Sequence, residues 1–284
     1  MIKKIIFSIL ITLLTFSIQA EDKTYKMVFV PASEKGDESD YKTLISITEK
    51  LTGFNIETIK VTDYNAAVEA MRAGRAHIAW YGGKTYVKAA EIAQAVAFAA
   101  GVRPGEKDAG YYTYFVVKKD SEIKKFDDVK GKVLSLNTIG STSGDLIPQV
   151  ELSKINLSTK NKDHFENVFY AGSHDACLLS VINNQADVCG MSSRNYEARL
   201  EDGTFKKEDV RIIHKSNRVP PPPLAYSKMI PIEDRDKIKK AVLEAHKHGQ
   251  IGGYGGKMSH YMEVKDSDYN VLREVIELLN KSKS

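Results

Sequence analysis

The sequence has few cysteines, a single tryptophan and no concentration of charge of one sign. Its 284 residues include 41 Lys and Arg against 37 Asp and Glu, and the two signs are interspersed, as in "KKDSEIKKFDDVKGK". A protein that holds nucleic acid through its phosphates needs a concentrated basic surface. We therefore expect no nucleic-acid partner, and we interpret the charged runs as solvated surface.

Long apolar stretches are also missing after the first twenty residues. The start, "MIKKIIFSILITLLTFSIQA", places two lysines before an apolar segment at 5–16, which is typical of an export signal and too short to span a bilayer. We predict a signal peptide at residues 1–20, cleaved after Ala20, and a mature protein in the periplasm. Ile18 leaves the exact cleavage site open, and an uncleaved membrane anchor is the alternative. Removal of the signal lowers the formal net charge from +4 to +2, because it takes away Lys3 and Lys4.

The only two cysteines are Cys177 and Cys189. In an exported protein such a pair can form a disulfide. Cys177 is predicted early in a helix and Cys189 on the strand below it, and a helix is usually too far from its sheet for good disulfide geometry. A disulfide and two buried thiols are both open, and neither predicts a catalytic thiol. The seven histidines show no zinc-ligand spacing, so we expect no metal and no cofactor.

What the sequence does contain is a regular alternation of strand and helix patterns. Apolar runs such as "TYKMVFVPAS" and "FNIETIKV" alternate with helical spacing in "DYKTLISITEKLTG" and "DYNAAVEAMRAGR", and a second series begins at "YYTYFVVKKDS". This alternation predicts an α/β protein with parallel sheets. "GQIGGYGGK" lacks the spacing of a nucleotide-binding loop and is interpreted as a mobile loop.

Two series of strands and helices in one chain predict two lobes. We assign residues 21–114 and 222–284 to lobe 1 and residues 115–221 to lobe 2. The chain is expected to cross between the lobes near 113–118 and 215–226, with the last helices returning to lobe 1. Ligands of α/β sheets bind at the carboxyl ends of the strands, so two facing lobes predict a ligand cleft.

The stretch "IGSTSGD" offers the clearest candidate site. Ser141, Thr142 and Ser143 lie between Gly140 and Gly144, where a predicted strand gives way to a helix. A helix N-terminus carries free N–H groups and a partial positive charge, and hydroxyl donors beside it would complete a receptor for a tetrahedral oxyanion. The alternative is ordinary helix capping, for which Ser and Thr are favoured whatever the function.

Other polar and aromatic residues follow predicted strands or lie at the lobe junction, and they are expected at the same place. They are Tyr64 in "DYN", Trp80 in "AWYGG", Tyr111 in "GYY" and His174 in "SHD". Tyr hydroxyls and a His N–H are donors that suit a partly protonated anion. Each residue also has an ordinary explanation, which is packing for a tyrosine and helix capping for "SHD".

Four segments together resemble the substrate-binding proteins of phosphonate, phosphite and phosphate ABC importers. They are "DYNAAVEAMRAGRAHIAWYGG", "GYYTYFVVKKDS", "GSTSGDLIP" and "YAGSHDACLLSVINNQADV", and the resemblance runs in the same order over roughly 26–226. It implies the two-lobed type II periplasmic-binding-protein fold, with a ligand cleft between the lobes and a hinge of two crossovers. It also implies a binding protein, not an enzyme, that delivers a small oxyanion to the membrane permease subunits of an ABC importer. We expect a monomer.

The resemblance also implies which residues hold the ligand. Carried over by position, the oxyanion cradle and the ligand-contacting tyrosines fall on Ser141, Thr142, Ser143, His174, Tyr64 and Tyr111. Family members that take aminoalkyl phosphonates hold the ammonium group with two acids, and the corresponding places here have Arg194 and Pro222. A cationic tail would meet no countercharge, which predicts a small or anionic ligand such as phosphite, methylphosphonate or phosphate. Arg194 either pairs with the anion or is a surface residue.

Two further functions are open at this point. Ser143, His174 and Asp175 contain the groups of an esterase-like hydrolase, but the chain has no G-x-S-x-G elbow, and a His and Asp adjacent in sequence do not form the usual base–orienter pair. The same fold can also serve as the ligand-sensing partner of a membrane receptor or bind another oxyanion or an organic solute. The sequence does not separate sensing from import.

Overall fold

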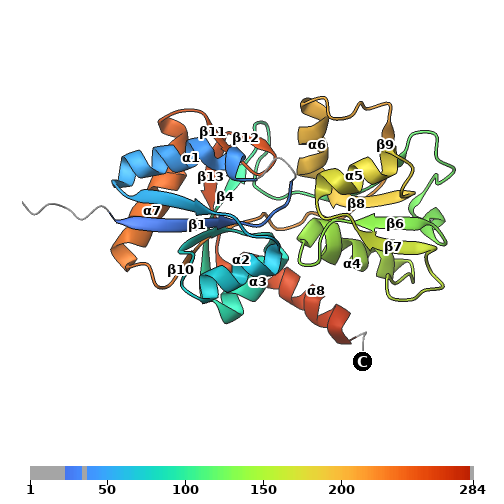
Figure 1. Ribbon diagram of the computed structural model, residues 1–284, viewed down its shortest axis with the longest axis horizontal. Coiled ribbons are helices and arrows are strands. Elements are labelled where there is room, and N and C mark those ends of the chain that lie inside the picture. The colour runs from blue at the N-terminus through green and yellow to red at the C-terminus, as the bar shows by residue number, and fades with distance from the viewer. Residues whose placement is uncertain (1–22, 34–36, 282–284) are drawn as a thin grey trace, which may run out of the picture.

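The computed structural model describes residues 23–33 and 37–281, which form two lobes side by side (Figure 1). The predicted signal peptide at 1–20 lies outside the described residues. Each lobe is built on its own β-sheet, so the predicted two-lobed α/β architecture is confirmed. Within the described ranges, no helix is both long and apolar enough to cross a membrane.

The first lobe contains a six-stranded sheet in the order β13–β4–β10–β3–β1–β2. Its strands are β1 (Thr24–Phe29), β2 (Asn55–Ile59), β3 (Ile78–Trp80), β4 (Ala95–Val102), β10 (Leu224–Ser227) and β13 (His260–Glu263). β1 pairs in parallel with β2 and β3, whereas β10 and β13 are antiparallel to their neighbours. The prediction of parallel sheets holds here for β1, β2 and β3 only, because β10 and β13 come from the part of the chain that returns from the second lobe.

The second lobe contains a five-stranded sheet in the order β7–β6–β8–β5–β9. Its strands are β5 (Thr113–Lys118), β6 (Val133–Leu136), β7 (Asn167–Tyr170), β8 (Val188–Ser192) and β9 (Val210–Lys215). β6 is parallel to β7 and β8, and β5 is antiparallel to β8 and β9. This sheet is also mixed, since the first strand after the crossing runs against the βαβ units that follow it.

Helices flank both sheets. Those of the first lobe are α1 (Asp37–Thr52), α2 (Tyr64–Arg72), α3 (Gly83–Ile92), α7 (Ile232–Glu244) and α8 (Asn270–Lys281), and those of the second are α4 (Ile147–Lys154), α5 (His174–Ile182) and α6 (Ser193–Glu201). Side-chain caps fix the beginnings of α2, α5 and α6, the last through Ser192. Asp63 accepts the N–H of Ala66 at the start of α2, and Ser173 accepts the N–H of Ala176 at the start of α5.

The chain crosses between the sheets at 103–112 and again at 216–223. The crossings lie side by side, because the N–H of Tyr111 donates to Val219 O (3.2 Å) and the N–H of Val219 donates to Tyr111 O (2.8 Å). The first crossing precedes the predicted 113–118, which forms β5 of the second sheet. Two adjacent crossings form the only links between the sheets along the described chain, which is the geometry of a hinge.

The sequence patterns did not predict two parts of the first lobe, β4 and a hairpin near the C-terminus. β4 reads "AVAFAAGV", and its Ala and Gly residues have low strand propensity. The stretch "GQIGGYGGK" is not a loop as predicted; it forms a hairpin of β11 (Ile251–Gly253) and β12 (Gly256–Met258). The hairpin packs closely on α1, because a Cβ at Gly252 would lie 2.1 Å from the backbone oxygen of Asp40. Glycine here permits a close approach of two backbones.

Cys177 of α5 and Cys189 of β8 form a disulfide, with their Cα atoms 5.6 Å apart. This separation lies in the usual range for a disulfide. The open question of bridge or thiols is therefore settled in favour of the bridge. The general distance between a helix and its sheet is a poor guide at this position, because α5 packs directly on β8.

Candidate functional site

The two lobes and the crossings meet around a small cavity of about 10 Å³, with room for about one water molecule. It is lined by Ala32, Tyr64, Trp80, Gly82, Tyr111, Ser141, Thr142, Ser143, His174, Pro222 and Tyr254. Six of the seven predicted ligand-binding residues are in this set, and Arg194 is not. Residues from positions 32 to 254 are thus brought to one place by the topology.

Four helix N-termini meet at the cavity. Tyr64 and His174 are the first residues of α2 and α5, Gly82 is the N-cap of α3, and Ser141 caps the π-helical turn Thr142–Leu146 that leads into α4. An α-helix N-terminus carries free N–H groups and roughly half a positive charge. No Lys, Arg, Asp or Glu is among the described residues that line the cavity. The arrangement therefore favours an anion through backbone dipoles and neutral donors.

Ser141 and Gly144 shape the turn that carries the three adjacent hydroxyls, residues 141–143, which is called the hydroxyl turn below. The Ser141 hydroxyl accepts the N–H of Gly144 (3.1 Å) and Nδ2–H of Asn137 (3.3 Å), so this residue is a helix cap, as the ordinary explanation had it. A Cβ at Gly144 would lie 2.3 Å from Asn137 Cβ and 2.9 Å from His174 Cε1. Glycine is therefore required for the turn to lie against His174.

Thr142 links the two lobes. Its Oγ1 accepts the N–H of Lys84 in the first turn of α3 (2.9 Å), and close by the Thr85 hydroxyl donates to Gly140 O (2.9 Å). A Cβ at Gly82 would lie 3.2 Å from Thr142 Oγ1, which is tighter than an ordinary contact. The first lobe thus touches the hydroxyl turn directly, and the cleft is closed in this structure.

His174 contributes a neutral imidazole. Its side chain is 1% exposed, and Nδ1 accepts the backbone N–H of Ser192 (3.2 Å). Burial lowers the pKa of His174 to about 3. The ring is therefore uncharged at neutral pH with its proton on Nε2, and this N–H is the donor that His174 can offer to the cavity it lines.

Tyr64 and Tyr111 are both buried at the cavity. Burial raises the pKa of Tyr111, and the hydroxyls of Ser143 and Thr142 and the charge of Arg194 oppose that rise. The phenol remains protonated at neutral pH and keeps its donor. Tyr111 also lies on the first crossing, so the same residue takes part in the hinge and in the cavity wall.

Comparison with known proteins identifies the family. Residues 27–269 match the family described as the phosphonate periplasmic substrate-binding protein of ABC transporters. The chain belongs to this family. The match covers both sheets and both crossings of the phosphonate-family protein, and it includes every predicted ligand-binding residue.

Individual relatives agree with this assignment. The phosphonates-binding periplasmic protein of Escherichia coli (strain K12) is 30% identical over 214 residues, which cover 69% of this chain and 62% of that protein, somewhat less than two thirds of its length. The phosphate-import protein of Mycolicibacterium smegmatis is 25% identical over 280 residues, or 92% of this chain and 87% of that protein.

Solved structures confirm the type II periplasmic-binding-protein fold. A binding protein component of an ABC phosphonate transporter from Pseudomonas aeruginosa superimposes with a TM-score of 0.79 at 22% identity, covering 92% of this chain and 87% of that one. A Prochlorococcus marinus protein solved in complex with methylphosphonate superimposes with a TM-score of 0.76 at 19% identity, covering 92% and 100%.

Arg194 of this phosphonate-family protein lies behind the cavity wall. It is 2% exposed, so its interpretation as a surface residue is wrong. Its guanidinium donates to the carbonyl oxygens of Gly101 (3.2 Å) and Ala109 (2.8 Å) and lies 3.4 Å from the Glu106 carboxylate. These contacts occupy both Nη atoms, whereas Nε is buried and has no hydrogen-bond partner among the described residues. The side chain instead joins α6 of the second lobe to β4 and the first crossing.

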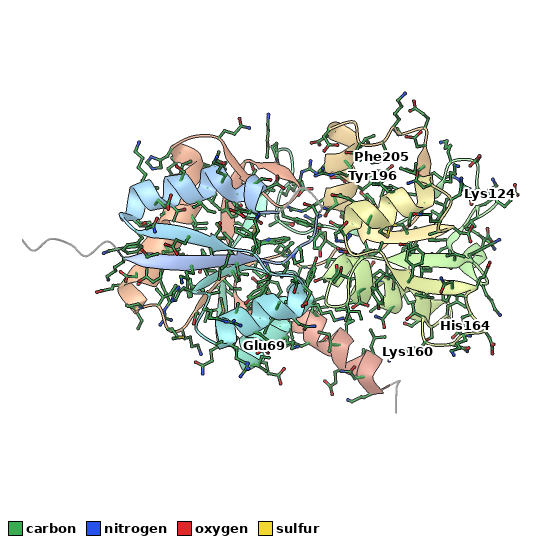
Figure 2. The ribbon with its side chains drawn as sticks, viewed as in Figure 1. Glu69, Lys124, Lys160, His164, Tyr196 and Phe205 are labelled. Atoms are coloured by element: carbon green, nitrogen blue, oxygen red, sulfur yellow. A yellow bond between two sulfur atoms is a disulfide. The ribbon has the colours of Figure 1, made fainter. Side chains whose placement is uncertain are left out.

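The helix that carries Arg194 is anchored in the second lobe. Tyr196 packs against Phe205 with ring centroids 5.0 Å apart, and the two lie together at the edge of that lobe (Figure 2). The ring of Tyr114 of β5 also contacts Tyr196, with centroids 5.6 Å apart. A second arginine makes a contact between the same two segments, but here the arginine belongs to the first crossing: Arg103 forms an ion pair with Glu197 of α6 (2.6 Å). α6 is therefore tied to the first crossing from both sides.

Tyr254 is a cavity residue that the sequence did not reveal. It lies at the tip of the β11–β12 hairpin, is buried, and places its ring 4.8 Å from Trp80 and 6.4 Å from Tyr111, centroid to centroid. The available signal was one aromatic residue between two pairs of glycines. A tight hairpin places such a residue at its tip, where it contacts whatever the hairpin covers.

A lysine does reach the hydroxyl turn, although none stands beside it in sequence. Lys84 of α3 places Nζ 2.5 Å from Oδ2 of Asp145, which follows "STSG" and also accepts from Gln149 (2.6 Å) and Tyr170 (2.9 Å). The positive charge is thereby neutralised outside the cavity. Among the described residues, no group of three or more His, Cys, Asp or Glu side chains is suited to a metal ion.

Proposed function

We propose that this protein is the periplasmic solute-binding component of an ABC importer and binds a small tetrahedral oxyanion of the phosphonate, phosphite or phosphate type. The observation that carries the proposal is the meeting of four helix N-termini at one cavity, with no charged side chain among the described residues of its wall. The proposed ligand donors are Tyr64, Tyr111, Ser141, Thr142, Ser143 and His174.

Neutral donors suit a carrier that must release what it binds. A hydrogen bond to a charged acceptor contributes about 1.5–3 kcal/mol. Several such bonds are enough for micromolar affinity, which corresponds to about 8 kcal/mol. No ion pair has to be broken when the ligand passes to a transporter.

The wall of the cavity argues against an aminoalkyl phosphonate. Pro222 lines it at the place where the family pattern has an acid, and no carboxylate is among its described lining residues. An ammonium group would lose its hydration without gaining a countercharge, which is costly in a buried site. We therefore infer a ligand without a cationic tail.

Ligand entry requires the lobes to separate. A cavity of about 10 Å³ accepts about one water, whereas a tetrahedral oxyanion has four or more heavy atoms. We propose that lobe 1 (residues 21–114 and 222–284) and lobe 2 (115–221) open about the paired crossings and close on the ligand, and that a monomer then docks on the permease from the periplasm.

The geometry does not support the hydrolase alternative. In a Ser-His-Asp triad the imidazole donates Nδ1–H to the carboxylate. Nδ1 of His174 instead accepts the N–H of Ser192, and Asp175 forms an ion pair with Arg199 (3.4 Å). Sensing through a membrane receptor would use the same cavity, and co-purification with a permease or with a receptor ectodomain separates the two roles.

Calorimetric titration of the mature protein tests the proposal. The panel contains phosphate, phosphite, methylphosphonate, 2-aminoethylphosphonate and sulfate. We expect at least one oxyanion without a cationic tail to bind, and Ser143→Ala to weaken it by about tenfold or more, because a hydrogen bond to a charged acceptor is lost. Ser153→Ala is the matched control, since it removes an exposed hydroxyl from α4 of the same lobe. If no oxyanion binds, the proposal fails.

A further inference from the structure

Trp80 carries an unused hydrogen-bond donor at the cavity. It is the last residue of β3, is 2% exposed, and lines the cavity. Its Nε1 is buried and has no hydrogen-bond partner in the described part of the chain. An indole N–H can only donate, and few buried donors in native proteins lack a partner. An unpaired donor at a ligand cavity points to an acceptor on the ligand.

The donors are divided between the two lobes. The hydroxyl turn and His174 approach the cavity from the second lobe, and Trp80 approaches it from the first lobe beside the ring of Tyr254. The hydroxyl turn, His174, Tyr64 and Tyr111 can together hold three corners of a tetrahedral anion, which leaves one corner for the part of the wall formed by Trp80, Tyr254 and Pro222. That corner is an oxygen in phosphate, a methyl group in methylphosphonate and a hydrogen in phosphite.

We propose that Trp80 Nε1–H donates to an oxygen at this fourth corner, so that the protein selects phosphate over methylphosphonate and phosphite. The inference rests on the function proposed above and adds the choice among its ligands. The aromatic wall by itself favours a methyl group, but burial of one methyl contributes only about fourfold in affinity. A buried donor left unpaired costs about fivefold to 160-fold in affinity, so the hydrogen bond decides the preference.

The single tryptophan allows a nearly isosteric test. Biosynthetic replacement of tryptophan by its benzothiophene analogue exchanges the N–H for sulfur at position 80 alone. Trp80→Phe is a second route to the same loss. Tyr226→Phe serves as the control, because Tyr226 lies on β10 of the same sheet, stacks on Phe98 and does not line the cavity.

Phosphate, methylphosphonate and phosphite are titrated calorimetrically at a pH where all three carry the same charge. We expect the unaltered protein and the control to bind phosphate more tightly than methylphosphonate, by up to about 40-fold once the methyl gain is subtracted, and the ratio to fall to one or below without the indole N–H. A ratio at or below one in the unaltered protein overturns the inference, even if neither altered protein folds. Equal losses for all three ligands also overturn it. Failure of all three to bind the unaltered protein refutes the proposed function itself.

Discussion

Acidification is expected to destabilise the ligand-free protein through His174. Burial lowers the pKa of this ring to about 3, whereas a histidine in an unfolded chain titrates near 6.5. As the pH falls below about 6.5, the His174 ring binds a proton in the unfolded chain but stays neutral in the folded protein. The stability that His174 permits above that pH is therefore lost progressively as the pH falls toward 3.

The size of the effect follows from these two pKa values. Linkage gives a loss of about 2 kcal/mol at pH 5 and about 3 kcal/mol at pH 4. Total folding stabilities are typically about 5–15 kcal/mol, so the loss is readily measured. His174→Asn removes the titrating ring, while the side-chain oxygen of asparagine can still accept the N–H of Ser192. The variant should therefore lose less stability than the wild type between pH 7 and pH 4.

Urea unfolding at pH 7, 6, 5 and 4 measures this difference directly. Carboxylates titrate in the same range, but they contribute equally to both proteins and cancel in the comparison. His248→Gln, which replaces an exposed histidine, controls for the loss of any histidine. If the wild type and His174→Asn show parallel stability profiles, the ring is not held neutral by burial, and its assignment as a neutral donor is refuted.

Three further perturbations test the contacts around the cavity. Arg194→Met is expected to weaken binding of every oxyanion ligand by about tenfold, because α6 loses its hydrogen bonds to the carbonyl oxygens of Gly101 and Ala109. The order of affinities among the ligands should stay the same, and a changed order in calorimetry would contradict this. Lys84→Met removes the cation from the buried Asp145 carboxylate and should lower the free energy of unfolding by about 1–3 kcal/mol, with partial recovery when Asp145→Asn is added; no recovery in thermal unfolding would show that the charge is not the cause. Cys177→Ala with Cys189→Ala should cost about 3 kcal/mol of stability for a loop of this size, and a reductant should destabilise the wild type alone; equal sensitivity of both proteins would contradict the bridge.

The sequence predicted the order of the elements well where local patterns decide it. Caps such as Asp63 and Ser173 mark the starts of α2 and α5, and apolar runs mark β1 and β6. The mixed pairing of the sheets was not predictable in this way, because strand direction depends on where the chain re-enters a lobe. β4 was missed because its alanines are selected by burial between neighbouring strands and not by strand propensity.

The structure brings the predicted site residues together at one cavity where short motifs carry them, and their role in ligand binding stays a prediction. Tyr64, His174 and the hydroxyl turn all lie at strand-to-helix junctions. The rule that ligands bind at the carboxyl ends of the strands in an α/β sheet was therefore enough to group them. Tyr254 and Arg194 could not be placed in this way. Their positions depend on contacts between segments far apart in the chain, such as Arg194 with Gly101 and the hairpin tip with Trp80.

Capping and ligand binding are not exclusive explanations of "IGSTSGD". The hydroxyl oxygen of Ser141 accepts the N–H of Gly144 within the turn, and Oγ1 of Thr142 accepts the N–H of Lys84 from the other lobe. A hydroxyl that accepts one hydrogen bond can still donate another, and the two bonds polarise each other. An oxyanion that takes the Thr142 proton therefore strengthens the bond from α3, which exists only when the lobes touch. Under the proposed function, the same three-residue turn caps a helix, would offer donors to an anion and would link ligand binding to closure of the cleft.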